Sequence, residues 1–155
     1  ALCLLKDQIS YEAVIMGRGK LEYKIKKFII ENDLKKNIRL VGYKSNPYPY
    51  IKQSNFVILT SLHEGLPNVL LEALVLKKFV ISSNCVSGPK EILSNGKVGA
   101  LFKVRNYKEL ARLIIFYNKN LKMRNRKIKF ALKNIYRFDY KKNLNLYSKL
   151  VQDNK

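Results

Sequence analysis

Two glutamates separated by seven residues lie where a predicted strand gives way to a predicted helix. Glu64 follows the apolar run 56–59, and Glu72 lies inside an apolar helix predicted from Pro67 to about Leu76. Proline suits the first turn of a helix, where its missing N–H costs nothing. A helix N-terminus offers unpaired N–H groups and a positive dipole end, which together favour a phosphate. The pair therefore indicates one carboxylate in a ligand-facing loop and one along the helix.

The spacing alone leaves a purely structural interpretation open. An acid before a helix often stabilises only the dipole, and an acid inside a helix is commonly a solvated surface residue. Asn68 and Glu72 share one helix face because they lie four residues apart, and Gly65 permits a tight turn. Neither fact by itself separates a ligand site from an ordinary helix start.

Length and composition are those of a single domain with a sufficient core. The chain has 155 residues, 47% of them hydrophobic, and no apolar run of the roughly eighteen residues that a membrane span requires. Cys3 and Cys85 are too few for a disulfide framework and lack the spacing of metal ligands. Isolated cysteines fit a reducing compartment, so we expect a cytoplasmic protein.

The formal net charge of +20 is extreme for a chain of this length. Such charge favours a nucleic acid, an anionic membrane surface or another polyanion as a partner. The lysines are dispersed, however, and they accompany abundant Asn, Ile and Tyr, a pattern that genome-wide compositional bias also produces. A basic nucleic-acid-binding α/β domain therefore stays open as an alternative, although we recognise no nucleic-acid-binding module in the sequence.

Short apolar runs alternate with helical patterns along the chain. Strands are predicted near Val14, Ile38, Phe56, Phe79 and Val98, and helices over residues 20–32, 50–54, 67–76, 90–94 and 106–118. The helix over 20–32 should bury an apolar stripe made of Leu21, Ile25, Phe28 and Ile29. The helix over 106–118 begins with a capping pair, Asn106 and Glu109. This alternation predicts an α/β fold with a Rossmann-like, doubly wound parallel sheet of about five strands.

Ligands of such sheets bind outside the carboxyl ends of the strands. Loops rich in glycine, serine and proline follow four of the predicted strands, at residues 17–19, 42–43, 61–68 and 82–89. We expect these loops to converge on one edge of the sheet and to form a single site.

The string Glu-Gly-Leu-Pro-Asn-Val-Leu-Leu-Glu-Ala, residues 64–73, resembles the donor-site motif of the retaining GT-B glycosyltransferases of the group 1 family (family 4). That motif has two glutamates separated by seven residues, with Gly and Pro after the first and Ala after the second. Similarity to the family extends over about 14–116, in the segments 15–19, 38–43, 79–93 and 99–102. The resemblance implies the C-terminal, nucleotide-sugar-binding half of a GT-B fold.

The resemblance also implies a role for each matched residue. Glu64, as the catalytic residue, would contact hydroxyl groups of the donor sugar, and Glu72 would bind the ribose hydroxyls. The other implied donor-binding residues lie at the loop and helix start, at the first glycine turn, beside the base and after the next strand: Gly65, Leu66, Pro67, Asn68 and Val69; Gly17; Arg39; and Glu91. No metal or other cofactor is implied, because a helix N-terminus and a cationic pair are able to stabilise a diphosphate.

The function implied by the family is sugar transfer. A hexose or N-acetylhexosamine would pass from a UDP- or GDP-sugar to a glycan or lipid-linked acceptor, with retention, in bacterial surface polysaccharide assembly. Nucleic acid is not an expected partner in this interpretation. A sugar-nucleotide epimerase of related fold remains an alternative, although such an enzyme should carry additional acids and histidines, and His63 is the single histidine here.

The resemblance starts after the first strand expected of this domain, which would precede Ala1 and occupy the centre of the sheet. We therefore expect a gap, or an abnormal closure, between the strands near Val14 and Phe56. A protein of two such domains would have roughly 350 to 400 residues. Residues 1–155 alone are expected to fold poorly and to lack transferase activity.

The C-terminal part of the chain, residues 121–155, is a basic helical segment that should pack on a donor-binding domain formed by residues 1–120. It carries one apolar stripe, Leu121, Ile128, Leu132 and Ile135. A break is expected near Phe138 and Asp139. Its cationic face is either simply solvated or attracted weakly to an anionic membrane leaflet, which would place the protein peripherally at the inner membrane face.

Overall fold

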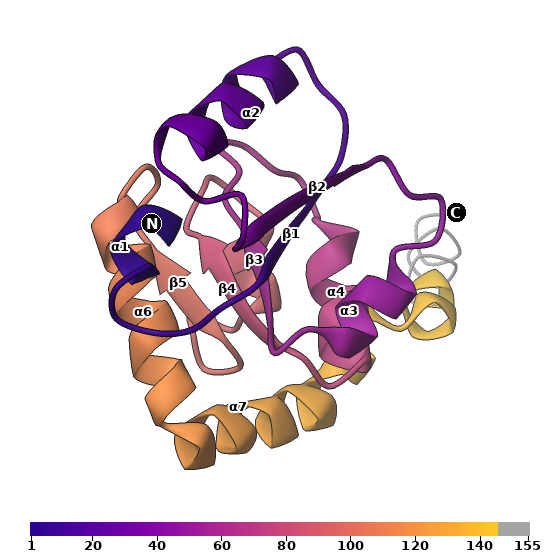
Figure 1. Cartoon of the computed structure of the whole chain (residues 1–155). Coiled ribbons are helices and arrows are strands. Elements are labelled where there is room, and N and C mark those ends of the chain that lie inside the picture. The colour runs from indigo at the N-terminus through magenta and orange to yellow at the C-terminus, as the bar shows by residue number, and fades with distance from the viewer. Residues whose placement is uncertain (146–155) are drawn as a thin grey trace.

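The computed structural model describes residues 1–145, in which short strands alternate with helices as predicted (Figure 1). The strands are β1 (Ala13–Met16), β2 (Ile38–Gly42), β3 (Phe56–Leu59), β4 (Phe79–Ser83) and β5 (Ala100–Phe102). The helices are α1 (Leu2–Leu5), α2 (Glu22–Glu31), α3 (Tyr48–Gln53), α4 (Asn68–Val75), α5 (Pro89–Ile92), α6 (Tyr107–Lys119) and α7 (Leu121–Asn134), and a 3-10 turn follows over Ile135–Phe138. Within this part of the chain no helix has the length and apolarity to cross a membrane.

The larger sheet is parallel and has the order β3-β4-β5, with β4 buried along its whole length. Alternate side chains of a strand point to opposite faces, and β4 follows this rule. Phe79 and Ile81 pack with α1 and α6 on one face, while Val80 packs with α3, α4 and α7 on the other. The run 79–81 is apolar throughout because helices cover both faces of β4. Helices on both faces of a parallel sheet are the predicted doubly wound arrangement.

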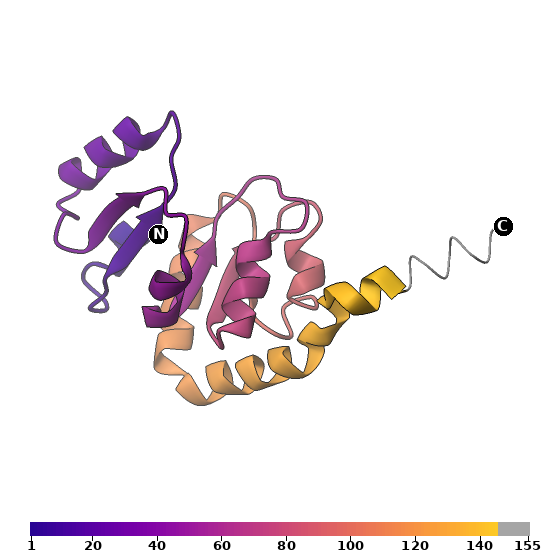
Figure 2. The same cartoon turned by 90° about the vertical axis from the view of Figure 1, so that its right-hand side faces the viewer.

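The strands β1 and β2 form a separate parallel pair, and no ladder joins β1 to β3 within residues 1–145. Figure 2 shows this pair, with α2 above it, as a separate small sheet beside the larger one. The expected gap between the strands near Val14 and Phe56 is therefore confirmed. Each of these two strands keeps one edge without a ladder partner in the described structure.

The apolar stripe predicted for the helix over 20–32 is largely uncovered, which corrects that prediction. In α2 only Ile29 is buried, against Leu34 and Ile38. Leu21 and Phe28 keep 61% and 52% of their surface exposed. The helix pattern itself was correct, but a two-stranded sheet offers α2 too little apolar surface to cover its stripe.

The segment before β1 connects the two sheets. Leu5 is 1% exposed and lies in the core beneath α6, whereas Leu2 and Tyr11 pack against the smaller core of α2 and β2 as well. The Tyr11 hydroxyl donates a hydrogen bond to the Leu2 carbonyl at 2.9 Å. This hydrogen bond joins residues of the same segment. The packing of Leu5 against α6 therefore contributes much of the attachment of the segment to the larger sheet.

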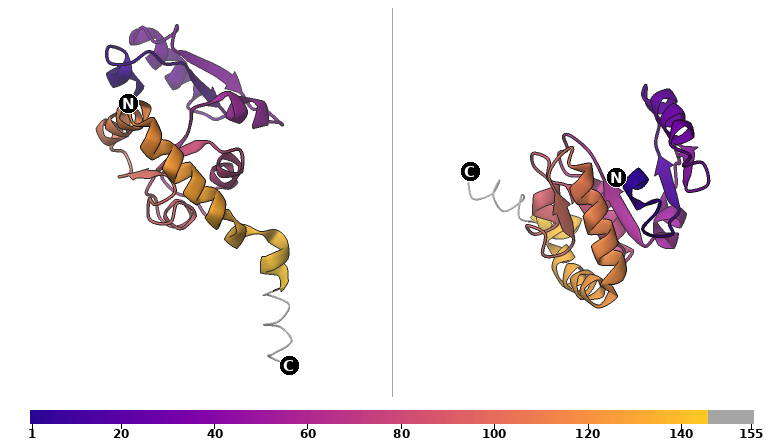
Figure 3. Two further views of the ribbon diagram at one scale, coloured as in Figure 1. Left: turned by 90° about the horizontal axis from the view of Figure 1, so that it is seen from below. Right: turned by 60° about the vertical axis from the view of Figure 1, so that its left-hand side comes forward.

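The C-terminal helices follow the predicted pattern. The Asn106 side chain accepts a hydrogen bond from the Glu109 N–H at 3.0 Å, which confirms the capping pair of α6. After α6, α7 crosses beneath the larger sheet, as the view from below makes clear (Figure 3). The helical run breaks at Asp139, where the backbone becomes extended, again as predicted. Residues 140–145 are helical, and the expected continuation to residue 155 lies outside the described residues.

The position of Leu5 generates a stability prediction. Leu5→Ala should lower the free energy of unfolding by about 2–5 kcal/mol, because it leaves a cavity between α1 and α6. The neighbouring Leu4 is 41% exposed, so Leu4→Ala is a matched control whose cost should stay below about 1 kcal/mol. Urea denaturation measures both values. Equal costs for the two variants would contradict the assigned core.

Candidate functional site

The loops that follow β3 and β4 meet at the carboxyl edge of the larger sheet. His63 and Val86 form an isolated parallel bridge between them. The Ser87 hydroxyl donates to the Glu64 carbonyl at 2.9 Å. The hydroxyl of the buried Ser83, the last residue of β4, donates to the Ser61 carbonyl at 2.7 Å. Backbone and hydroxyl groups from the second loop thus hold the shape of the first.

The Glu64 side chain is itself held in place. The Ser61 hydroxyl donates to Glu64 Oε1 at 2.6 Å, and the glutamate is half-buried. A single hydroxyl contact satisfies only part of the carboxylate, which accepts several hydrogen bonds when ionised. The other oxygen has no hydrogen-bond partner within residues 1–145 and is available to a ligand hydroxyl.

The closest approach in this region is between the loop after β3 and the loop after β4. A Cβ atom added to Gly88 would lie 1.9 Å from the Gly65 carbonyl oxygen and 2.7 Å from Cδ of Pro67. Gly88 also has φ +68°, a conformation that other residues adopt at a cost. A glycine is therefore required here for the loop after β4 to touch the loop after β3.

The helix α4 begins directly beyond this contact. Pro67 occupies the N-cap position and Asn68 the first helical position, one residue later than the sequence predicted. Pro67 is buried, Gly65, Leu66 and Asn68 are exposed, and Val69 is half-buried. No side chain caps the helix start. Its N–H groups and positive dipole end are the features that attract an anion.

Glu72 lies one helical turn after Asn68, on the same face of α4, as its spacing predicted. Its side chain is half-buried, and within residues 1–145 its carboxylate makes no hydrogen bond or ion pair. The helix therefore presents this acid beside its own N-terminal turn. In the same part of the chain no group of three or more His, Cys, Asp or Glu residues is placed to hold a metal ion.

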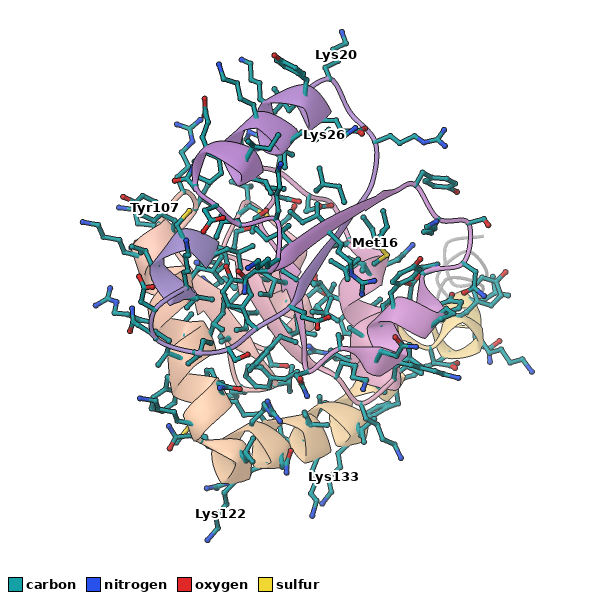
Figure 4. All side chains as sticks on the ribbon, in the orientation of Figure 1. Met16, Lys20, Lys26, Tyr107, Lys122 and Lys133 are labelled. Carbon is teal, nitrogen blue, oxygen red and sulfur yellow. The ribbon has the colours of Figure 1, made fainter. Side chains whose placement is uncertain are left out.

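Gly17 and Arg39 belong to the other sheet. The Gly17 N–H donates to the Gly42 carbonyl at 2.9 Å at the end of β1, just after Met16, which is labelled in Figure 4. Arg39 is exposed and lies opposite Val14, near the amino end of β2 rather than at a carboxyl end. The structure thus brings the four predicted loops together in two pairs, one at the end of each sheet. In the described part of the chain, neither Gly17 nor Arg39 makes a hydrogen bond with the loop 61–67.

Glu91 lies in α5, directly after the loop that supports Glu64. Its side chain is exposed, and its backbone carbonyl accepts a hydrogen bond from Arg137 at 2.5 Å. The same guanidinium nitrogen donates to the Ile92 carbonyl at 3.0 Å and to the Ser94 hydroxyl at 2.8 Å. Arg137 therefore caps the carboxyl end of α5 and connects the C-terminal segment to the site loops.

Sequence reasoning missed the residues that support Glu64. They are three serines and one glycine: Ser61, Ser83, Ser87 and Gly88. A signal was present, since Ser61 and Ser83 stand at or just after the ends of predicted strands, and Gly88 precedes a proline that starts a helix. Their partners, however, lie in another loop, which periodicity does not reveal.

The fold and the site together define a class of protein. A parallel sheet with helices on both faces, and with an acid-bearing loop and an uncapped helix start at its carboxyl edge, has the ligand-binding arrangement of a doubly wound α/β domain. The chain matches the family "Glycosyl transferases group 1" over residues 1–134. It therefore belongs to the group 1 glycosyltransferases, as the resemblance implied.

Individual relatives agree with this membership. An uncharacterized glycosyltransferase of Methanocaldococcus jannaschii is 44% identical over 80 residues, which are 52% of this chain and 20% of that protein. The N-acetylgalactosamine-N,N'-diacetylbacillosaminyl-diphospho-undecaprenol 4-alpha-N-acetylgalactosaminyltransferase of Campylobacter jejuni is 33% identical over 93 residues, 60% of this chain and 26% of that enzyme. The chain thus spans about a quarter or less of the length of these curated relatives.

Solved structures agree on the fold. A mutant of S. aureus TarM, crystallised with Fondaparinux, alpha-GlcNAc-glycerol and UDP, superimposes with a TM-score of 0.85 at 25% identity. That superposition covers 99% of this chain and 31% of TarM. Anabaena HepE in complex with UDP-glucose gives a TM-score of 0.84 at 21% identity, covering 97% of this chain and 43% of HepE, and shows likeness of fold alone.

The contact at Gly88 generates a prediction about the site. Gly88→Ala should push the loop 61–67 away from the loop after β4, because the new methyl group would overlap the Gly65 carbonyl. We expect faster amide hydrogen exchange in the loop 61–67, measured by mass spectrometry, because the displaced loop loses its contacts.

Gly96→Ala is the matched control for this substitution. Gly96 also has a positive φ of +84°, but a Cβ added there meets nothing within 4 Å. Both variants carry backbone strain of about 1–3 kcal/mol, and only Gly88→Ala adds the overlap. Equal hydrogen exchange of the loop 61–67 in Gly88→Ala and Gly96→Ala would show that the loop contact does not shape the site.

Proposed function

We propose that the protein transfers a hexose or N-acetylhexosamine from a UDP- or GDP-sugar to a glycan or lipid-linked acceptor in surface polysaccharide assembly, with retention of configuration. The observation that carries the proposal is the half-buried Glu64, held by Ser61 beside the uncapped start of α4. Family membership supports the reaction class. The name of the Campylobacter jejuni relative gives a lipid-linked acceptor, and TarM was crystallised with UDP.

The donor would lie across the carboxyl edge of the larger sheet. The distal phosphate would meet the first N–H groups of α4, where the dipole stabilises the negative charge that grows on the leaving diphosphate. Pro67 has no N–H to donate, so its part is to set the direction of the chain into α4. This arrangement stabilises charge through fixed backbone groups and assigns no step to a metal.

The two glutamates would have different tasks. Glu64, in the loop, would accept hydrogen bonds from hydroxyl groups of the sugar and hold it for attack by the acceptor hydroxyl. Glu72, one turn along α4, would accept hydrogen bonds from the ribose. Because this proposal assigns Glu72 to the ribose rather than to the anomeric centre, it does not treat the pair as the acid and nucleophile of a glycosidase.

A first test removes the Glu64 carboxylate. Glu64→Ala in the intact enzyme should lower kcat by about 10- to 100-fold, which corresponds to a lost charge-assisted hydrogen bond of about 1.5–3 kcal/mol that tightens in the transition state. Sugar transfer from a radiolabelled donor measures the effect. Glu12→Ala removes an exposed carboxylate outside the loops and serves as the control. Wild-type turnover in Glu64→Ala would end this assignment.

A second test separates the nucleotide from the sugar. Glu72→Ala should weaken UDP binding by about 1–3 kcal/mol while changing kcat little, because the ribose contact is the same in the ground state and the transition state. Titration with UDP and with 2'-deoxy-UDP is the decisive measurement. If Glu72 binds the ribose, the variant should lose most of the preference for UDP; an unchanged preference would assign the ribose elsewhere.

A further inference from the structure

The outward face of α7 carries a stripe of basic side chains. These residues lie at i, i+4, i+7 and i+11 and are all exposed: Lys122, Arg126, Lys129 and Lys133. This spacing follows one face of a helix, and the helix of 14 residues is about 21 Å long. Figure 4 shows Lys122 and Lys133 pointing away from the protein on the same side. We call these four residues the basic stripe.

Other cations of α7 point inward and have partners. The Lys127 ammonium donates to the carbonyls of Gly96 and Gly99, the latter at 2.8 Å, and burial lowers its pKa. The Arg124 guanidinium lies 5.2 Å from the centroid of the Phe56 ring. The cations of this helix therefore fall into two sets, one that fastens the helix to the sheet and one that faces outward.

Within residues 1–145 no acid forms an ion pair with the basic stripe. The sequence contains no Asp or Glu between Glu109 and Asp139. The ion pairs found in residues 1–145 join side chains between Lys6 and Asp33, far from α7 in the sequence. The four charges of the stripe consequently add to one another and create a local positive field.

Apolar side chains flank the basic stripe. Met123 and Phe130 lie at the next position of the helix after Lys122 and Lys129, and they keep 45% and 44% of their surface exposed. Basic residues on a helix face are attracted to anionic lipid headgroups, and an exposed phenylalanine beside them adds apolar surface that can enter the interface. Base recognition, by contrast, relies on aromatic rings gathered in a groove or platform, and this flank has one ring.

The basic stripe lies away from the donor loops. Lys127 contacts the loop that leads into β5, and Arg124 contacts Phe56 at the start of β3, so α7 runs along the amino ends of the strands. The loop with Glu64 lies at the carboxyl end of β3, about 13 Å away along four residues. A partner on the stripe would leave the donor edge open.

We propose that the basic stripe of α7 binds an anionic lipid bilayer surface, with Phe130 and Met123 entering the headgroup region. The proposal rests on charge complementarity and on the exposed apolar flank, and it does not depend on the proposed sugar transfer. The bilayer would meet the amino edge of the sheet, while the donor edge would face away from it.

Co-sedimentation with vesicles tests the charge requirement. The protein should bind vesicles that contain phosphatidylglycerol and should not bind phosphatidylcholine vesicles. Converting the four stripe residues to glutamine should weaken binding on the order of 500-fold, about fivefold for each charge. The matched control converts four exposed lysines away from the stripe to glutamine, namely Lys20, Lys24, Lys35 and Lys36. Equal losses in the two variants would overturn the proposal, because net charge alone would then explain binding.

A spectroscopic probe tests the orientation. The chain contains no tryptophan, so Phe130→Trp introduces a single reporter at the flank of the stripe. Its emission should shift to the blue on anionic vesicles and stay unchanged on neutral ones. Vesicle binding without that shift would mean that another surface makes the contact, and the assignment to α7 would be wrong.

Two further measurements complete the test. A single-stranded RNA oligomer that binds more tightly than the anionic vesicles would favour the nucleic-acid alternative and overturn the proposal. Titration of the stripe variant with UDP and with GDP should give the wild-type affinities. Failure of both nucleotides to bind to wild type and variant alike would refute the proposed donor site while leaving the vesicle result intact, so the two hypotheses fail separately.

Discussion

The candidate site depends on one close approach, that of Gly88 to the Gly65 carbonyl and the Pro67 ring. Two loops from neighbouring strands touch there with no room for a side chain. The contact determines where α4 starts and allows Ser87 to reach the backbone of Glu64. The strands β3 and β4 are paired in register, so the hydrogen bonds between the loops that follow them form on a rigid sheet. A flexible acid in a loop thereby becomes a positioned one.

The C-terminal helices support this region from the opposite direction. Arg137 caps α5, which follows the same loop, and Lys127 joins α7 to the turn before β5. Both cations donate to backbone carbonyls rather than to acids. Such contacts satisfy buried polar groups, and their loss would leave carbonyls without partners. Part of the large positive charge is thus structural, and it differs in role from the charge that faces solvent.

The sequence was informative where local pattern and fold agree. The alternation of strands and helices, the cap at Asn106 and the break at Asp139 followed from periodicity and known turn chemistry. The gap beside β1 was predicted from the family resemblance. The positions of Glu64 and Glu72 on loop and helix were also predictable. The roles of these two residues in donor binding stay predictions.

What the sequence did not reveal are contacts between distant segments. The stripe of α2 was predicted to be buried because its period is helical, yet burial depends on what the neighbouring sheet offers. Arg39 was placed at the site by family pattern, whereas the structure puts it near the amino end of β2. The supporting serines were missed because a hydroxyl near a strand end has many possible partners. Contacts of this kind join residues that are distant in the sequence, and they are determined by the fold of the whole chain.

The split sheet has a consequence for any sample prepared from residues 1–155 alone. In residues 1–145, β1 and β3 each present an edge without a ladder partner, and such edges are templates on which strands of other molecules assemble. The formal charge of +20 on these 155 residues opposes this encounter, because every copy repels every other copy. Salt shortens the range of that repulsion, to about 8 Å at physiological ionic strength. The colloidal stability of such a sample therefore depends on ionic strength, through the open edges of two short strands.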